Sequence, residues 1–284
     1  MKQLLILSGK GGTGKTTVAS AFINLAKAKA SADCDVDAPN LHLVLSMHDE
    51  PILSDYYGLP KAVINKEKCV SCGLCRQHCR FDAIDEDFKV DTFACEGCSV
   101  CEAICPAGAV EMKDAVAGEL MLYKNDRVFS TAQLKMGSGT SGMLVTEVKK
   151  QMKDHAVCAE LAVIDGSPGI GCPVIASISG VDMVLLVAEP SVSGISDMER
   201  IIKTAQKFLT PVAICVNKYD TNLENTDKIE QFCNEHKLPF VGKIPYDKEA
   251  VKAINSGKSI VQVPCRAGEA VRDIYEKTLK ILNK

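Results

Sequence analysis

The sequence predicts an α/β fold, in which a mainly parallel sheet carries helices on both faces and is interrupted by a small insert. Continuous apolar runs of strand length recur along the chain, and most are followed by a segment of helical character. This alternation stops between residues 61 and 114, where eight of the fourteen cysteines lie. We therefore expect a discontinuous domain of residues 1–60 and 115–284, and an inserted domain of residues 61–114.

The N-terminal residues predict a buried strand, a glycine-rich turn and a helix. The strand is expected over residues 3–7, which form a short apolar run. The helix is expected over residues 15–29, with one face formed by Val18, Phe22, Leu25 and Ala26. The following segment, residues 31–40, is polar and only weakly strand-like.

Further apolar runs predict four more strands, at residues 161–164, 183–188, 212–216 and 239–244. Helices are expected at residues 195–208, 222–236, 247–255 and 267–282, with a short one after the Gly- and Pro-rich turn 166–173. After the insert, residues 118–134 are compatible with a hairpin and residues 141–153 with a helix.

The composition excludes several classes of protein. The net charge is −3 with lysine and arginine spread along the chain, which does not indicate a nucleic-acid surface. The N-terminal apolar run of four residues is shorter than a signal peptide requires, and no apolar run approaches the roughly 20 residues of a membrane span. We therefore expect a cytoplasmic protein, in which a high cysteine content indicates metal or redox chemistry rather than disulfides.

The segment from Gly9 to Thr16 matches the phosphate-loop pattern G-x-x-x-x-G-K-[ST]. In such a loop the backbone N–H groups surround the phosphates, Lys15 reaches the β and γ oxygens, and the Thr16 hydroxyl holds Mg²⁺. The predicted strand before it and helix after it are the context that this motif requires. The expected nucleotide-binding residues of the loop are Gly11, Gly12, Thr13, Gly14, Lys15, Thr16 and Thr17.

The insert contains an internal repeat with an offset of 26 residues, in which the spacing C-x2-C-x2-C-x3-C occurs twice. The first run is formed by Cys69, Cys72, Cys75 and Cys79, and the second by Cys95, Cys98, Cys101 and Cys105. The alternative to iron–sulfur clusters is zinc, which usually takes two separated C-x2-C pairs. The doubled four-cysteine spacing favours two [4Fe–4S] clusters.

The insert resembles bacterial two-cluster ferredoxins. In that family the fourth cysteine of each run ligates the other cluster. The resemblance implies one cluster on Cys69, Cys72, Cys75 and Cys105, and another on Cys79, Cys95, Cys98 and Cys101. One departure is Arg80, which stands where the second run has Pro106. Among the remaining cysteines, Cys158, Cys215 and Cys233 are interpreted as packing residues.

With Lys10 in addition to Lys15, the phosphate loop resembles the deviant Walker A family: MinD and ParA ATPases, the nitrogenase iron protein and Mrp-type iron–sulfur carriers. The resemblance implies an ATP- and Mg²⁺-dependent ATPase that closes as a dimer. Lys10 would cross the interface to the phosphates bound by the other subunit, comparable in role to an arginine finger. The second subunit is expected to be another copy of this chain or a similar ATPase.

The same resemblance implies roles for polar residues elsewhere in the chain. In the segment DCDVDAPN, Asp33 would lie near Mg²⁺ and Asp35 would position the attacking water, with Asp37 as the alternative acid. In VIDGSPGIG, Asp165 would be the Walker B acid bound to Mg²⁺ through water. The expected base contacts are Asn217, Pro245 and Asp247.

Cys172 lies seven residues after Asp165, the offset of a cluster-ligating cysteine in the nitrogenase iron protein. A second bridging cysteine would fall in or near residues 135–143, and none occurs there. A symmetric dimer would thus supply two ligands where four are usual. The alternative is that Cys172 is a small turn residue.

The leading functional prediction is an ATPase that couples nucleotide-driven dimer switching to electron transfer through two [4Fe–4S] clusters, with a redox or iron–sulfur acceptor protein as partner. One alternative is assembly or delivery of an iron–sulfur or metal cofactor. Another is a MinD- or ParA-like positioning switch, for which the final helix is membrane-compatible, although a helix docked on the sheet is preferred. A passive module with an inactive ATPase is disfavoured by Lys15, Thr16, Asp35 and Asp165.

Overall fold

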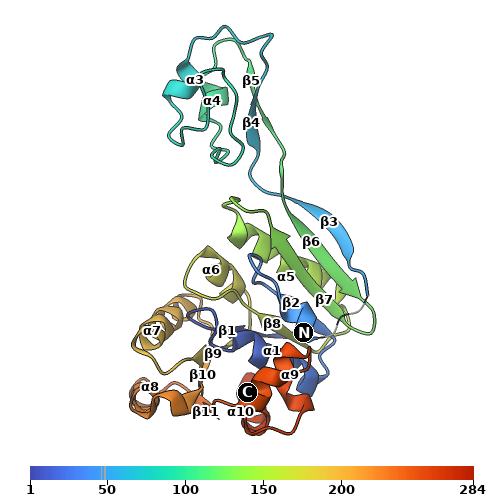
Figure 1. The fold of residues 1–284 in the computed structure, drawn as a ribbon, viewed down its shortest axis with the longest axis vertical. Helices are drawn as coiled ribbons and strands as arrows, with labels where there is room; N and C mark the ends of the chain where they lie inside the picture. Colours follow the sequence, from blue (N-terminus) through green and yellow to red (C-terminus); the bar gives the residue numbers. More distant parts are fainter. Residues whose placement is uncertain (46, 48) are drawn as a thin grey trace.

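A computed structural model describes residues 1–45, 47 and 49–284. Its main body is a nine-stranded sheet in the order β11-β10-β9-β1-β8-β2-β7-β6-β3, with helices on both faces (Figure 1). The strands from β11 to β7 pair in parallel, whereas β6 pairs antiparallel with both β7 and β3. The predicted α/β fold is therefore confirmed.

The strands of the sheet follow the apolar runs of the sequence. In chain order they are β1 (Lys2–Leu7), β2 (Ala30–Asp33), β3 (Ile52–Tyr57), β6 (Val116–Lys124), β7 (Val128–Leu134), β8 (Leu161–Asp165), β9 (Met183–Ala188), β10 (Val212–Asn217) and β11 (Phe240–Ile244). The predicted hairpin is the pair β6–β7. Strand β3 was not predicted, because as an edge strand it keeps five of its six residues exposed and has no apolar alternation.

Each face of the sheet has its own apolar core. One core contains buried side chains from α1 (Lys15–Ala26), α2 (Leu41–Val44) and α10 (Arg266–Leu282), with α9 (Lys248–Asn255) beside them. The other contains side chains from α5 (Ser141–His155), α6 (Cys172–Ile178), α7 (Val192–Lys207) and α8 (Leu223–Glu235). Two short 3-10 helices complete the body, η1 (Tyr219–Thr221) and η2 (Ile260–Gln262).

The structure shows where α1 ends and which face of α10 is buried. Helix α1 ends at Ala26 rather than near residue 29, because Lys27 adopts a left-handed conformation (φ 46°) and caps it. The apolar face of α10 is buried against the sheet at Val271, Ile274 and Leu282, as expected for a docked helix. Among the described residues, no helix combines the length and apolar character needed to cross a bilayer.

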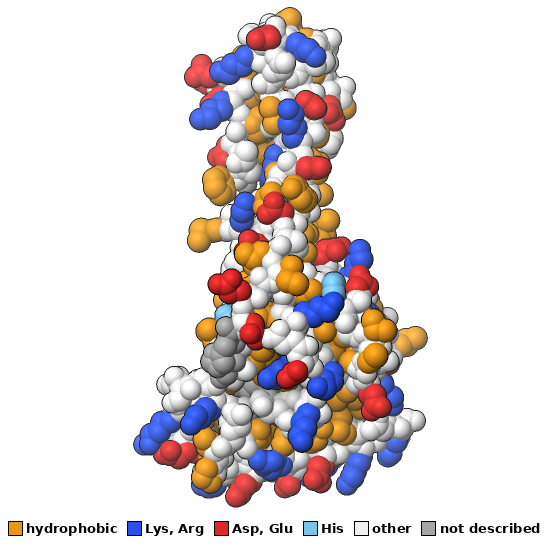
Figure 2. Space-filling model, turned by 90° about the vertical axis from the view of Figure 1, so that its right-hand side faces the viewer, with side chains coloured by type: hydrophobic (Ala, Val, Ile, Leu, Met, Phe, Trp, Pro, Cys, Tyr) orange, Lys and Arg blue, Asp and Glu red, His pale blue; other side chains and the backbone are white. Residues whose placement is uncertain are grey.

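Residues 61–113 form a separate small body, joined to the sheet by the long antiparallel pair β3–β6 (Figure 1). This body contains a two-stranded ladder of β4 (Lys61–Ile64) with β5 (Val110–Lys113), and two one-turn helices, α3 (Leu74–Gln77) and α4 (Val100–Ala103). Its core consists of Ala62, Cys75, Ala83, Ile84, Cys95 and Val110. The space-filling view shows acidic and basic side chains interspersed over it, and hydrophobic ones at the narrow region below (Figure 2).

Helices α5 and α6 are tied together by a buried lysine. The Lys149 ammonium donates to three carbonyl oxygens at the C-terminal end of α6: Ala176 (3.1 Å), Ser177 (2.7 Å) and Ser179 (2.6 Å). Positive charge is favourable at a helix C-terminus, where carbonyl groups lack intrahelical partners. Burial nevertheless lowers the pKa of Lys149 to about 8. The contact thus fixes two helices to each other at a cost in desolvation.

This lysine predicts a pH dependence of stability. Lys149 gives up its proton near pH 8 in the native state but near its ordinary value of 10.5 when unfolded, so the unfolded state holds more protons between these values. The free energy of unfolding should therefore rise with pH there, by about 2 kcal/mol between pH 7.5 and 10 relative to Lys149→Met. Urea unfolding of both proteins across this range measures the difference. A difference independent of pH would contradict the prediction.

Candidate functional site

The glycine-rich loop between β1 and α1 has the backbone conformation of a phosphate cradle. Gly12 (φ 77°) and Gly14 (φ 98°) are both left-handed, a conformation that side chains rarely adopt. A Cβ atom on Gly14 would also lie 2.2 Å from the Asn217 side-chain nitrogen. The loop therefore requires glycine at residue 14 for two reasons.

Lys15 and Asp165 form a buried ion pair at the base of this loop. The Lys15 Nζ lies 2.6 Å from Asp165 Oδ1, and the two side chains are 6% and 0% exposed. Burial opposes the charge of Lys15, but the nearby carboxylates, above all that of Asp165, raise its pKa. Without phosphates, the carboxylate thus neutralises the lysine that a phosphate loop aims at its ligand.

The second oxygen of Asp165 supports a magnesium site. Asp165 Oδ2 is buried and has no hydrogen-bond partner among the described residues. The Thr16 hydroxyl lies 3.4 Å from Lys15 Nζ, at the same end of the pair. A buried carboxylate and a hydroxyl that both lie near Lys15 Nζ are the kinds of oxygen ligand that suit Mg²⁺ with its waters. Thr16 and Asp165 therefore fit the ion that the sequence predicts for them.

Asp33 lies on β2 directly opposite Asp165 on β8. Its carboxylate accepts three backbone N–H bonds, from Asp35 (3.0 Å), Asn40 (3.0 Å) and Leu41 (3.0 Å). Burial, together with the negative charge of Asp165, raises the pKa of Asp33 to about 7. The structure thus places Asp33 beside the expected magnesium ligand, while both its oxygens shape the loop that follows β2.

The loop after β2 separates the two candidate acids. Asp35 lines the phosphate-side cavity together with Gly12 and Lys15, and burial raises its pKa while Lys15 opposes the rise. Asp37 is exposed, and its carbonyl accepts a bond from the Gln133 side chain (3.1 Å). The geometry favours Asp35 over Asp37 as the acid that faces the phosphates.

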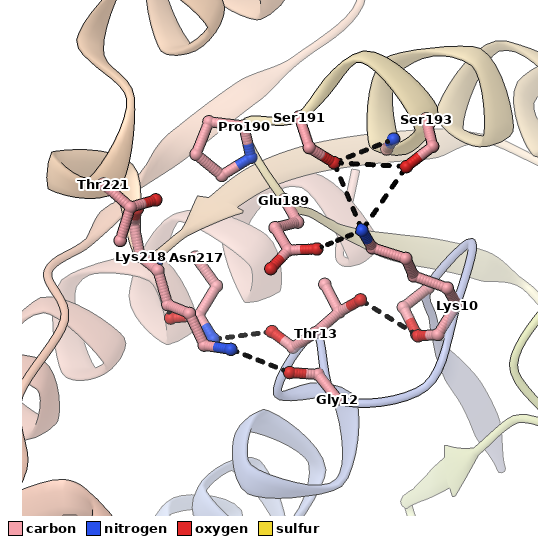
Figure 3. Close-up of polar contacts among 12 residues, drawn as sticks. Lys10, Gly12, Thr13, Glu189, Pro190, Ser191, Ser193, Asn217, Lys218 and Thr221 are labelled. Atoms are coloured by element: carbon pink, nitrogen blue, oxygen red, sulfur yellow. Dashed lines mark hydrogen bonds and ion pairs between the residues drawn. The ribbon is translucent and has the colours of Figure 1, made fainter.

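Lys10 is held by its own chain in this structure (Figure 3). Its Nζ lies 2.7 Å from Glu189 Oε2, and it donates to the hydroxyls of Ser191 (3.2 Å) and Ser193 (3.4 Å). The side chain is still 40% exposed, so the ion pair is accessible to water and weak. These partners were missed by the sequence analysis, although the run EPSVS directly follows the buried strand β9 and so falls at the loop-bearing edge of the sheet.

Asn217 and Lys218 clamp the phosphate loop from the end of β10 (Figure 3). The Asn217 amide donates to the Thr13 carbonyl (2.7 Å), and Lys218 Nζ donates to the Gly12 carbonyl (2.8 Å). Asn217 Oδ1 accepts from the backbone N–H of Lys218 (3.0 Å). The predicted base-contacting amide is thus occupied by the protein here, and Lys218 is a loop contact that the sequence analysis did not identify.

Two adjoining cavities line the loop. The phosphate-side cavity contains Lys10, the loop residues 11–17 and Asp35. The other lies beyond Gly12, Gly14 and Thr17 and contains Asn217, Pro245 and Asp247. Asp247 also caps α9: burial opposes its charge, but backbone N–H bonds from Ala267 and Glu249 lower its pKa. The structure therefore brings the predicted phosphate and base residues to one groove.

The eight cysteines of the insert line two separate cavities. Cys69, Cys72, Cys75 and Cys105 share one cavity with apolar residues that include Ile64, Phe88 and Val110. Cys79, Cys95, Cys98 and Cys101 share the other, with Phe81, Ile84 and Met112 among its walls. Each set takes three cysteines from one run and the fourth from the other. No group of three or more His, Cys, Asp or Glu side chains in the described part of the chain converges on a single metal ion.

The cysteine sites also offer hydrogen bonds to sulfur. Cys105 Sγ accepts a bond from the backbone N–H of Ala109 (3.3 Å). This bond and further N–H groups of the turn at residues 107–110 lower the pKa of Cys105, against the effect of burial. Backbone N–H groups aimed at sulfur stabilise thiolates and tune iron–sulfur clusters. An apolar cavity with four thiols and such donors fits a [4Fe–4S] cluster better than a single zinc ion.

The remaining cysteines differ in environment. Cys215 and Cys233 are buried, which agrees with their interpretation as packing residues, whereas Cys158 is exposed and its interpretation was wrong. Cys158 lies in a turn between α5 and β8 rather than on an apolar face. Cys172 is exposed at the first position of α6, where a Cβ on Gly142 would lie 3.3 Å from its own Cβ. Residues 135–143 therefore do lie beside Cys172, but they supply no thiol.

Comparison with known proteins agrees with this geometry. Residues 4–260 match the model of the CobQ/CobB/MinD/ParA nucleotide binding domain. An uncharacterised protein of Methanocaldococcus jannaschii is 32% identical over 280 residues, which are 97% of this chain and 95% of the relative. MinD of Pyrococcus horikoshii, solved in complex with Mg-ADP, superposes with a TM-score of 0.63 at 20% identity, over 99% of this chain and 96% of that chain.

A shorter match concerns the pyruvate synthase subunit PorD of Methanothermobacter marburgensis. It is 34% identical over 53 residues, which are 19% of this chain and 65% of PorD. This match has about the length of the segment 61–114. The match to the nucleotide-binding model instead spans most of the chain, from β1 to the first residue of η2. The chain therefore belongs to the CobQ/CobB/MinD/ParA nucleotide-binding domain family.

Proposed function

We propose that this protein binds and hydrolyses ATP and couples the resulting dimer switching to electron transfer through two [4Fe–4S] clusters in the inserted domain. The observation that carries the proposal is the sorting of the eight cysteines into two cavities, each with three thiols from one run and one from the other. This arrangement is carried on the same chain as a phosphate loop with two lysines. An acceptor protein would complete the redox function.

The nucleotide site supports hydrolysis through the residues around Lys15. Phosphates bound in the loop would compete with Asp165 for Lys15, because a phosphate oxygen carries the charge that Asp165 now supplies. Asp165 and Thr16 would then hold Mg²⁺, which neutralises charge on the β and γ phosphates. Asp35 borders the phosphate-side cavity and is the residue that would orient the attacking water.

Lys10 supports a switch between two partners. In the present arrangement it pairs with Glu189 on its own chain, in an exposed contact that contributes little stability. On dimer closure it would leave Glu189 and reach the phosphates of the opposing subunit, where it stabilises the charge of the transition state. A copy of this chain or a similar ATPase could serve as the opposing subunit.

The insert supports clusters that are retained rather than donated. One cysteine of each cavity is buried (Cys75 and Cys95) and one is exposed (Cys72 and Cys98), and apolar side chains line both cavities. When bound, the clusters would accept and pass on single electrons. The surrounding residues would hold them, exclude water on the inner side and donate hydrogen bonds to sulfur. These features favour electron transfer over delivery of a cluster.

Mixing of variant chains should show that Lys10 acts on the site of the opposing subunit, whereas Lys15 acts on the site of its own chain. Lys15→Ala should lower ATP turnover by at least about 100-fold, and Lys10→Ala by a comparable factor, because each removes charge stabilisation from the phosphates. The exposed α7 residue Lys203 offers a control, Lys203→Ala, that should turn over normally. Mixing Lys10→Ala with Asp35→Asn chains should restore part of the activity, since each mixed dimer has one intact site. No recovery on mixing would argue against action of Lys10 across the interface.

Serine substitutions should reveal how the cysteines are sorted. Cys79→Ser should perturb the same EPR component of the reduced protein as Cys101→Ser, although Cys79 belongs to the first run. Cys105→Ser should instead perturb the component affected by Cys72→Ser. Cys158→Ser is the control, because this exposed cysteine lies outside the insert. Grouping of Cys79 with Cys72 would show that the cysteines are sorted by run instead.

An anaerobic redox titration monitored by EPR tests the coupling between the two domains. We expect MgATP to shift the midpoint potential of a cluster by tens of millivolts, where 59 mV corresponds to a tenfold change for one electron. The Lys15→Ala protein should show no such shift. Superimposable titrations, with two clusters per chain and active ATP hydrolysis, would favour cofactor delivery or positioning instead.

A further inference from the structure

The segment formed by residues 133–142, which we call the junction segment, contacts the loop that follows Asp33. The backbone N–H of Leu134 donates to the Val36 carbonyl (2.9 Å), and the Gln133 side chain donates to the Asp37 carbonyl (3.1 Å). Asp35, which faces the phosphates, lies directly before these two acceptors. A displacement of this loop on nucleotide binding would therefore act on the start of the junction segment.

The other end of the junction segment contacts the first residue of α6, directly after the loop that follows Asp165. Gly142 packs closely against Cys172, the first residue of α6, and a Cβ at Gly142 would meet the Cys172 backbone at 3.3 Å. The loop at residues 166–171 joins α6 to the phosphate loop, since Gly169 N–H donates to the Ser8 carbonyl (3.1 Å). Lys149 fixes the far end of α6 to α5. Helices α5 and α6 would thus move as one unit with this loop.

The middle of the junction segment lies against the insert. A Cβ on Gly137 would be 3.2 Å from Cδ1 of Phe93, and one on Gly139 would be 3.4 Å from Oε2 of Glu96. Phe93 is 72% exposed, so its ring rests on the junction segment rather than inside a core. Both insert residues belong to the second cysteine loop, residues 93–98, which carries Cys95 and Cys98.

The internal repeat shows that these contacts are specific to the second run. With the offset of 26 residues, Phe93 and Glu96 correspond to Glu67 and Val70 in the first run. Gly97 corresponds to Ser71, and both are left-handed, with φ of 68° and 52°. A Cβ on Gly97 would lie 2.4 Å from the carbonyl oxygen of Pro60, which lies between β3 and β4. The first run thus accepts a side chain in a conformation where the second run, packed against Pro60, requires glycine.

We propose that the second cysteine loop is a docking element on the junction segment. Through this contact the nucleotide state is transmitted to the Cys79/Cys95/Cys98/Cys101 site in preference to the Cys69/Cys72/Cys75/Cys105 site. Loops that close on a γ-phosphate are two-state elements, and the junction segment contacts both of them. The inference rests on the proposed function in requiring nucleotide binding and clusters. It adds the route between them and the cluster that is addressed.

Hydrogen exchange of the cluster-loaded protein, with and without Mg²⁺ and β,γ-imido-ATP, tests the route directly. The amides of Phe93 (2.8 Å) and Cys95 (2.9 Å) donate to Asp91, so their exchange reports on the order of the second cysteine loop. We expect the nucleotide to change exchange in residues 133–142 and also in residues 93–98. A change confined to the nucleotide site, or to residues 133–142 alone, would overturn the proposal.

The repeat supplies a matched control for the docking contacts. In the Phe93→Ala/Glu96→Ala variant, the nucleotide should still change hydrogen exchange in residues 133–142. It should no longer change hydrogen exchange in residues 93–98. In Glu67→Ala/Val70→Ala, which alters the corresponding exposed positions of the first run, both differences should persist. A difference that survives in residues 93–98 of the docking variant would refute the route. Should that variant lose iron, the milder Phe93→Leu takes its place, with the same expected losses reduced in size.

EPR of the reduced proteins separates this inference from the proposed function. The nucleotide should alter the component assigned to the Cys79/Cys95/Cys98/Cys101 site, and the docking variant should lose this response while it keeps its iron content and ATP turnover. Absence of iron or of nucleotide binding in the parent protein would refute the proposed function, and this inference with it. Iron, binding and turnover without a response confined to that component would refute this inference alone.

Discussion

The buried ion pair of Lys15 with Asp165 is the interaction on which the nucleotide site depends. It connects the first turn of α1 to the end of β8 across 150 residues of sequence. Loss of one partner would leave the other charged in an apolar interior, at a cost of about 3–5 kcal/mol. Because Asp33 lies opposite Asp165 in the sheet, two carboxyl groups stand near the single positive charge of Lys15. In the proposed function, phosphate and Mg²⁺ would take over the interactions that these carboxylates now make.

The insert is stabilised by different forces. Its apolar core consists of six small or medium side chains, two of which are cysteines, whereas the main body has an extended core on each face of its sheet. So small an apolar core contributes little stability, and small domains are often reinforced by metal or disulfide links. Two clusters that each join both cysteine runs would provide such links. In this interpretation the clusters hold the insert together as well as carrying electrons.

The strand pair β3–β6 and the second cysteine loop decide how the two bodies meet. The pair forms the edge of the nine-stranded sheet, and the chain passes from its ends into β4 and β5 of the insert. Contacts of Phe93 and Glu96 with the junction segment add a second attachment beside it. Because these contacts involve one run of a near-symmetric repeat, the two cysteine sites are inequivalent with respect to the ATPase body. Of the two cysteine sites, the one that contains Cys95 and Cys98 is therefore the one connected to the main body by these contacts.

The sequence by itself determined the features that depend on local spacing. The phosphate loop, the two cysteine runs and most strands and helices of the α/β body follow from short-range patterns. The weakly patterned strands β3, β4 and β5 and the one-turn helices α2, α3 and α4 were missed. The tertiary structure alone decided which distant residues meet. It paired Lys10 with Glu189, engaged Asn217 with the Thr13 carbonyl, and placed Asp35 on the cavity beside the glycine-rich loop while Asp37 is exposed. It also exposed Cys158, because solvent exposure depends on how a turn packs against the rest of the molecule, and no periodic pattern records that packing.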